Sequence, residues 1–384
     1  MNIDSCIAFA QDLIRISSMS GKEKTIIERL IAEMRILGFD DIRVDENGSS
    51  IGTIRGKGKG STLLLDGHCD TVEITNPSDW SFNPFGGEIH GENLYGRGAA
   101  DMKCALAAMI YAAGSIDRSQ LAGSVVISAT VVEELMEGIS FKTVVDSVKP
   151  DFVIIGEATD LNVNRAGRGR AEIKIVTTGK SAHSSSPHLG VNAVNMMAKI
   201  IQSIEKVELP MDEFLGKAQM VLTDIISEPY PGYSVIPNKC ISTYDRRLLP
   251  GETNDSVINM ILADPSKTNV PFSISIEQGE HQTYTGRILK GEKFFPAWSF
   301  PENHELVQNA IKGLIQTGLS PLVSGYQFCT NAAYCAGVAG IPTIGFGPGT
   351  EGSAHIVNEF IPVSDLRAAA FGYKGIIESI LSTQ

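Results

Sequence analysis

The sequence predicts an α/β protein that carries a second, α+β domain inserted into the first. Short apolar runs alternate with helical stretches in both the N-terminal and the C-terminal parts of the chain, a pattern typical of strands buried on both faces of a sheet. Between about residues 171 and 280 the order of elements changes. A chain of 384 residues also exceeds what one hydrophobic core usually supports, so two domains are expected.

The elements of the first domain follow from periodicity and from the residues that bound each run. Two amphipathic stretches near the N-terminus are interpreted as surface helices of the scaffold. Short apolar runs between glycine or polar residues are interpreted as strands, and a stretch rich in alanine as a closely packed helix. In order, we expect helices at Cys6–Ile16 and Lys22–Leu37, a strand at Leu63–Leu65, a helix at Met102–Ala113, strands at Val125–Ile127 and Phe152–Ile155, a helix at Glu305–Leu314 and a strand at Pro342–Phe346.

The inserted segment has its own order of elements, which is ferredoxin-like. We therefore assign residues 1–170 and 283–384 to one domain and residues 171–282 to the insertion. The expected elements of the insertion are a strand at Ala171–Thr177, a helix at Val191–Val207, strands at Ala218–Ser227 and Lys239–Arg246, a helix at Asn254–Ala263 and a strand at Phe272–Glu277.

Composition argues against several classes of partner. The formal net charge of −12 gives no basic surface for nucleic acid or for anionic membranes, so neither partner is expected. No apolar run approaches the roughly 20 residues of a membrane helix, and the start of the chain lacks the pattern of a signal peptide. The six cysteines are scattered and are interpreted as free thiols. We expect a cytoplasmic protein.

Potential metal ligands follow three of the expected strands. His68 and Asp70 follow the first run, Glu133 and Glu134 the second, and Glu157 the third. In open α/β sheets the crevice outside the carboxyl ends of the strands binds ligands, so these side chains are expected to converge. Two more candidates lie elsewhere, Asp101 before the alanine-rich helix and His355 after Gly347-Pro348-Gly349. Imidazole and carboxylate ligands without thiolate suit zinc, cobalt or manganese, and the set suffices for two ions.

The sequence with these candidate ligands resembles the co-catalytic metallopeptidases that include acetylornithine deacetylase, succinyl-diaminopimelate desuccinylase, aminoacylase and glutamate carboxypeptidases. The resemblance covers essentially the whole chain. It implies a zinc-peptidase-like catalytic domain with a sheet between helices and an inserted lid and dimerisation domain. The motifs that carry it are Gly67-His68-Cys69-Asp70, Gly96-Arg97-Gly98 with Asp101-Met102-Lys103, Glu133-Glu134, Gly156-Glu157, Ala182-His183-Ser184, Gly347-Pro348-Gly349, and His355 with Asn358-Glu359.

The resemblance implies a role for each residue of the cluster. Asp101 bridges two divalent metal ions, most simply zinc. His68 and Glu157 complete one metal site, and Glu134 and His355 complete the other.

The same resemblance implies the roles of three groups around the metal ions. Glu133 is the free acid, which takes a proton from the attacking water and passes it to the leaving nitrogen. Asp70 accepts the other N–H of the His68 ring and fixes its orientation. The peptide bond between Asp101 and Met102 is expected to be cis.

Three further residues are expected to contact the substrate or the reaction intermediate. His183, in the inserted domain, is expected to stabilise the oxyanion, acting in the site of a partner subunit. Arg247 is expected to grip a substrate carboxylate, with Arg246 as its rival. Gly349 is expected to line the substrate site.

The function implied is hydrolysis of an amide bond in a small substrate that carries a carboxylate. Glu at position 157 resembles the deacylase and carboxypeptidase branch, so an N-acyl amino acid deacylase is the first hypothesis. A dipeptidase or carboxypeptidase is the alternative within the family, since both need the same metals and the same carboxylate clamp. A binding protein that keeps the fold without catalysis is the alternative from another class. A homodimer is expected.

Overall fold

The computed structural model describes residues 1–263 and 268–382, and these form two compact units. Unit 1 comprises Met1–Gly167, Glu280–Lys290 and the described residues from Trp298 onward. Unit 2 comprises Arg168–Gly279 and Gly291–Ala297. The segment 291–297, which the sequence placed in the first domain, belongs to unit 2 because its strand pairs there. Residues 168–170 also belong to unit 2, and residues 280–282, which the sequence placed in the insertion, belong to unit 1. The last residues of the expected range 283–384 lie outside the described residues.

Unit 1 is built on a nine-stranded mixed sheet. Its central strands β6, β3, β7 and β20 run parallel to one another, so their carboxyl ends share one edge of the sheet. Along the sheet the strands are β1 (Asp41–Val44), β2 (Ser50–Arg55), β6 (Ala122–Thr130), β3 (Gly58–His68), β7 (Phe152–Ile155), β20 (Thr343–Gly345), β8 (Val163–Gly167) and β18 (Trp298–Ser299), with β19 (Val323–Tyr326) also paired to β8.

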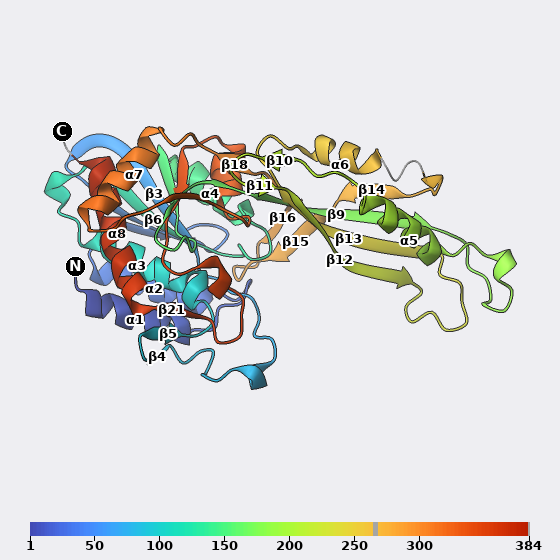
Figure 1. Ribbon diagram of the computed structural model, residues 1–384. Coiled ribbons are helices and arrows are strands. Elements are labelled where there is room, and N and C mark those ends of the chain that lie inside the picture. The colour runs from blue at the N-terminus through green and yellow to red at the C-terminus, as the bar shows by residue number, and fades with distance from the viewer. Residues whose placement is uncertain (264–267, 383–384) are drawn as a thin grey trace. The chain divides into compact units, whose positions relative to one another are not determined.

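Helices cover both faces of this sheet, as the sequence predicted (Figure 1). Leu63 and Leu65 of β3 point into a core shared with five helices, whereas Leu64 packs on the other face with Phe141 and its neighbours. This alternation explains why the run Leu63–Leu65 is apolar throughout. The first layer contains α1 (Ile3–Arg15), α2 (Lys24–Ile36), α3 (Cys104–Gly114), α7 (Glu305–Gln316) and α8 (Val363–Leu381), and the second contains α4 (Ile139–Val148).

Two smaller sheets lie outside the main sheet of unit 1. A three-stranded sheet joins segments far apart in the sequence, because its outer strand comes from the C-terminal part of the chain. Its strands are β4 (Glu88–His90), β5 (Asn93–Tyr95) and β21 (Phe360–Pro362). A separate pair, β15 (Gln278–Gln282) with β16 (Ile288–Glu292), contains residues of both units.

The six elements predicted for the insertion occur in unit 2 in the predicted order, and three strands of two residues each were not predicted. Its antiparallel sheet runs β12, β13, β9, β14, and two helices pack against one face. Buried and half-buried residues alternate along β9 and β13, which is typical of a sheet with one covered face. The elements are β9 (Gly169–Thr178), α5 (Ala193–Ile204), β10 (Met211–Asp212), β11 (Gly216–Lys217), β12 (Gln219–Glu228), β13 (Lys239–Leu248), α6 (Asn254–Leu262), β14 (Ser273–Ile276) and β17 (Phe294–Phe295).

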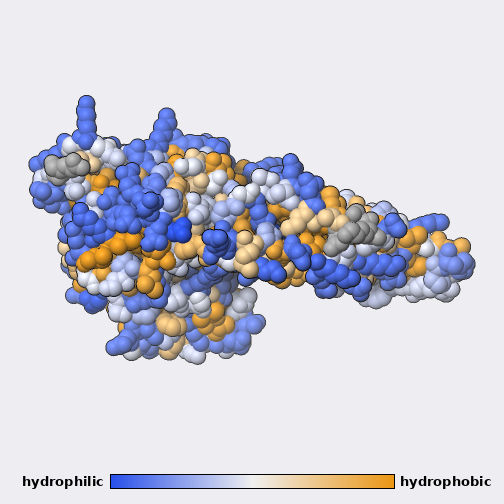
Figure 2. Space-filling model, turned by 45° about the horizontal axis from the view of Figure 1, so that its top comes forward, coloured by the Kyte–Doolittle hydropathy of each residue, from blue (hydrophilic) through white to orange (hydrophobic). Residues whose placement is uncertain are grey.

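Three helices differ from what the sequence predicted. The alanine-rich helix was expected from Met102, but α3 begins at Cys104 because Asp101 and Met102 have non-helical backbone angles. The helices α4 and α8 were not predicted at all, although α4 packs on one face of the sheet and α8 packs against α3 and α7 in the core on the other. No helix among the described residues is long and apolar enough to span a membrane. Hydrophobic and hydrophilic residues are interspersed on the face shown in Figure 2.

Candidate active site

The three strand ends that the sequence singled out lie side by side. β3 ends at His68, β6 is followed by Glu133 and Glu134, and β7 is followed by Glu157. Since β6, β3 and β7 are adjacent parallel strands, these side chains leave the sheet at the same edge. His68, Glu133 and Glu157 are almost completely buried. The predicted convergence of these residues is therefore confirmed.

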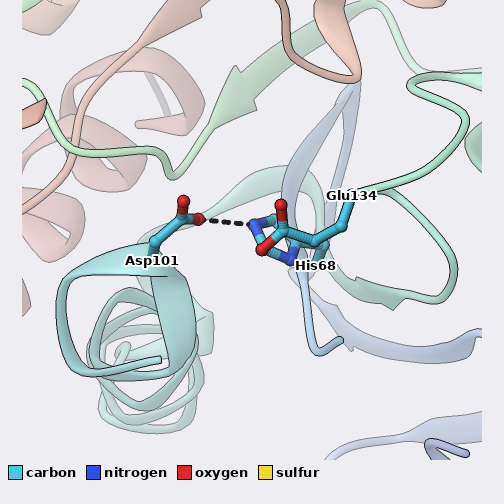
Figure 3. A group of neighbouring side chains, drawn as sticks. All are labelled: His68, Asp101 and Glu134. Atoms are coloured by element: carbon cyan, nitrogen blue, oxygen red, sulfur yellow. Dashed lines mark hydrogen bonds and ion pairs between the residues drawn. The ribbon is translucent and has the colours of Figure 1, made fainter. Parts of the chain in front are cut away.

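Asp101 lies at the centre of this cluster, between two histidines. Its Oδ1 lies 2.7 Å from Nε2 of His68, and its Oδ2 lies 3.1 Å from Nε2 of His355. Each histidine also faces a glutamate, with His68 Nε2 3.3 Å from Glu157 and His355 Nε2 3.1 Å from Glu134. Figure 3 shows Asp101 and Glu134 approaching the His68 ring from different segments of the chain.

The ligand-type atoms are close enough to share metal ions. Atoms of His68, Asp101 and Glu134 lie within 4.8 Å of one another, and so do atoms of His68, Glu133 and Glu157. Glu133 is thus brought beside the expected ligands, at a position that suits either a ligand or a free acid.

The electrostatics of the cluster call for positive charge. Burial raises the pKa of the Glu133 carboxyl well above its ordinary value and that of Glu157 to about 7. Burial also opposes ionisation of Asp101, but hydrogen bonds from His355 and His68 outweigh it and lower the pKa of Asp101. Burying several carboxylates beside two imidazoles is costly, and divalent cations would compensate their negative charge. Nitrogen and oxygen donors in this arrangement fit divalent metal ions.

Asp70 makes different contacts from those expected. The His68 Nδ1 lies 3.0 Å from the backbone carbonyl oxygen of Asp70 and 3.6 Å from its carboxylate, so the carbonyl is the nearer acceptor. The Asp70 carboxylate instead accepts the backbone N–H groups of Glu133 at 3.1 Å and Glu134 at 3.2 Å, and the hydroxyl of Ser20 at 2.6 Å. Asp70 therefore holds the loop that carries the two glutamates.

A buried ion pair holds the backbone at Asp101. The Glu359 carboxylate accepts the N–H groups of Ala100 at 2.9 Å and Asp101 at 3.1 Å, and it lies 2.6 Å from the Arg97 guanidinium. The sequence singled out the motifs that contain Arg97 and Glu359 without assigning them this contact, because it forms between segments 262 residues apart. The Asp101–Met102 peptide bond is cis, as expected.

Among the residues of unit 2, Arg246 and Arg247 differ sharply in their surroundings. The Arg246 side chain is fully buried and donates to the carbonyl groups of Gln219 at 3.2 Å and Arg247 at 2.6 Å, and to Glu252 at 2.5 Å. The Arg247 side chain is 30% exposed and pairs with Asp245 at 2.8 Å. Arg247 is therefore the better placed of the two to meet a ligand.

The remaining two expected residues lie in loops. His183 of unit 2 is exposed, and its Nδ1 lies 2.7 Å from the Ser185 hydroxyl. Gly349 of unit 1 is buried and has a φ of +75°, and its carbonyl accepts the N–H of Asp160 at 2.7 Å. The left-handed backbone favours glycine at position 349.

Comparison with known proteins identifies a family of peptidases. Residues 64–379 match the model of peptidase family M20/M25/M40. The chain is 35% identical to the uncharacterized protein YgeY of Escherichia coli strain K12, over 98% of this chain and 94% of that protein. It is 32% identical to acetylornithine deacetylase of Yersinia pseudotuberculosis, over 80% of this chain and 76% of that enzyme.

A solved structure shares the fold. The crystal structure of a tripeptidase from Staphylococcus aureus superposes with a TM-score of 0.77 at 22% identity, over 99% of each chain. At this identity the likeness shows the fold alone.

Proposed function

Since the chain belongs to peptidase family M20/M25/M40, it is a hydrolase of C–N bonds, and we propose that it removes the acyl group from a small N-acyl amino acid. The single observation that carries the proposal is the placement of Asp101. Its two oxygens face two separate histidines, and each histidine is paired with a glutamate. This arrangement suits a pair of divalent metal ions with one bridging carboxylate.

In this proposal the metal ligands are divided between two ions. His68 and Glu157 would hold one ion, His355 and Glu134 would hold the other, and the Asp101 carboxylate would serve both. When bound, the ions supply Lewis acidity toward the amide carbonyl and lower the pKa of the attacking water. Zinc is the first choice for this donor set, with cobalt and manganese as alternatives.

The proton transfers are assigned to Glu133. As a general base it accepts a proton from the attacking water, and as a general acid it delivers that proton to the leaving nitrogen. Burial raises the pKa of this carboxyl and so favours its protonated form, and bound cations would favour the carboxylate that accepts the proton. The Asp70 carboxylate accepts the Glu133 N–H, and this bond fixes the backbone position from which the Glu133 side chain extends.

The partial exposure of Arg247 in unit 2 supports the hypothesis that the substrate carries a carboxylate. Its guanidinium keeps part of its surface exposed, and a fork of N–H donors matches a carboxylate in geometry. The similarity to acetylornithine deacetylase favours an N-acyl amino acid over a peptide. A dipeptidase or carboxypeptidase reaction is the second candidate, because it needs the same metal ions and the same clamp.

We also propose a cytoplasmic homodimer. The outer strand β12 of unit 2 exposes Val221, Ile225 and Ile226, and a second copy could cover these side chains. In such a dimer His183 would donate to the oxyanion in the partner's site. All six cysteines are free and buried, which suits a reducing compartment.

The test is a panel of N-acetyl amino acids, N-succinyl amino acids and dipeptides. The protein is first stripped with a chelator and then assayed with zinc, cobalt or manganese. Turnover of N-acyl substrates that disappears on stripping and returns with metal supports the proposal. Turnover of dipeptides alone would replace it by the second candidate, and no turnover on any substrate would favour a binding protein.

A further inference from the structure

The segment Ser18–Glu23, between α1 and α2, contacts the loop that follows β3. The Ser18 hydroxyl donates to the carbonyl of Cys69 at 2.7 Å, and the Ser18 carbonyl accepts the Thr71 N–H at 3.0 Å. The Ser20 hydroxyl donates to the Asp70 carboxylate at 2.6 Å. These contacts surround Asp70, whose carboxylate holds the loop that carries Glu133 and Glu134.

The same segment also contacts the loop that follows β6. Oε1 of Glu23 accepts the backbone N–H of Val132 at 3.1 Å and that of Gly21 at 2.8 Å. Val132 is buried and has a φ of +58°, a left-handed conformation that a β-branched residue rarely adopts. Because Val132 directly precedes Glu133, its backbone sets the direction in which the two glutamates leave β6.

The Glu23 carboxyl is placed where burial opposes its ionisation. The residue is fully buried, and within residues 1–263 and 268–382 its Oε2 has no hydrogen-bond partner. Burial is the largest cause that raises the pKa of Glu23 to about 7, and the charge of Asp70 adds to it. Glu23 is the N-cap residue of α2, yet its side chain makes no capping hydrogen bond. The Glu23 carboxylate accepts hydrogen bonds from Gly21 and from the turn at Val132 and none from the first turn of α2.

We propose that Ser20 and Glu23 are positioning residues for the proton-transfer group. Glu23 holds the left-handed turn at Val132, Ser20 fixes Asp70, and together they set the orientation of Glu133. The part that concerns catalysis depends on the proposed role of Glu133, whereas the part that concerns the turn does not.

The experiment compares four variants of the full chain. Glu23→Ala removes the acceptor for the Val132 N–H, and Glu23→Gln keeps an acceptor oxygen of the same reach. Ser20→Ala removes only a hydroxyl and serves if Glu23→Ala does not fold. Glu33→Ala is the matched control, because Glu33 is a buried carboxylate of the same helix that bonds to Arg29 and Tyr111.

Two readouts are needed, hydrogen exchange and kinetics. Exchange measured by mass spectrometry on peptides that span residues 131–136 reports the turn without any assay of activity. We expect about tenfold faster exchange there in Glu23→Ala and no change in Glu33→Ala, since only the first loses the bond to Val132. We expect kcat to fall about 10- to 100-fold in Glu23→Ala at unchanged KM and metal content, because a small misplacement of a reacting group has this effect. Ser20→Ala lowers kcat less, and Glu23→Gln retains kcat within about threefold of the wild type.

The outcomes separate the two proposals. Equal exchange of the 131–136 peptides in Glu23→Ala and Glu33→Ala would overturn the positioning role. An equal loss of kcat in Glu33→Ala, or no rescue by Glu23→Gln, would also overturn it. A wild-type protein without turnover on any substrate would refute the proposed function, while the exchange comparison would still decide whether Glu23 holds the turn.

Discussion

The expected catalytic residues of unit 1 and those of unit 2 are held in very different ways. His68, Asp101 and Glu133 lie in a largely buried network in which carboxylates, imidazoles and backbone N–H groups bond to one another. His183, in contrast, is exposed and bonds to Ser185, two residues away in the sequence.

The residues of the unit 1 cluster make their contacts within that unit. His183 of unit 2 depends on a substrate or a second subunit for a catalytic contact. The unit 1 cluster is preorganised, because contacts from distant segments fix each member before any substrate arrives. The role proposed for the exposed His183 of unit 2 requires that a substrate or a second subunit meets it. Substitutions in the two regions should therefore differ in size and in the quantity that they change.

The largest effect is expected from Glu133→Gln. The variant should keep its metal content and lose about 10²- to 10⁴-fold in kcat, since general acid–base catalysis typically contributes this much. Metal analysis beside steady-state kinetics provides the measurement. Loss of one metal ion in the variant would show that Glu133 is a ligand, which its position beside His68 and Glu157 also permits.

The next effect is expected from His183→Ala, with a loss of about 10²- to 10³-fold in kcat if the ring stabilises the oxyanion. Mixing His183→Ala subunits with Glu133→Gln subunits tests whether the residue acts across a dimer. If it does, a mixed dimer has one site with both groups intact, and part of the activity returns. Proven exchange of subunits without any recovery would place His183 in its own subunit's site or outside catalysis.

A smaller effect, on KM, is expected from Arg247→Ala. Loss of a charge-assisted bond to the substrate carboxylate should raise KM by about tenfold or more, with a smaller change in kcat. Arg246→Ala is the comparison, because its buried guanidinium bonds within unit 2 and its loss should lower the thermal midpoint instead. A rise in KM confined to Arg246→Ala would exchange the two assignments.

The smallest effect is expected from Ser185→Ala. The hydroxyl bonds to the exposed His183 ring, and such a bond contributes about 0.5–1.5 kcal/mol, or about tenfold in kcat at most. Asp70→Ala is the counterpart in unit 1, where the lost carboxylate holds two backbone N–H groups and a hydroxyl. Similar losses of kcat in the two variants would contradict the contrast between a preorganised and an exposed site.

Much of the fold was predictable because local patterns carry it. The run Phe152–Ile155 coincides with β7, and the elements expected between Ala171 and Glu277 all occur in order. The helices α4 and α8 were missed. The role proposed for Ser20 and Glu23 was missed too, because Glu23 lies in the stretch Lys22–Leu37, which was interpreted only as a surface helix, and Ser20 was assigned no element. Their importance comes from contacts with Asp70 and Val132, which no local periodicity reveals.

The sequence by itself indicated the central strands of the main sheet and the candidate ligands that follow three of them, because parallel strands bring their carboxyl ends to one edge. Only the tertiary structure decided which atoms face one another: the two oxygens of Asp101 toward two histidines, the Asp70 carboxylate toward backbone N–H groups, and Arg246 toward the interior. The physical reason is that hydrogen bonds and burial depend on distances between segments remote in sequence. Residue types and spacing constrain those distances without fixing them.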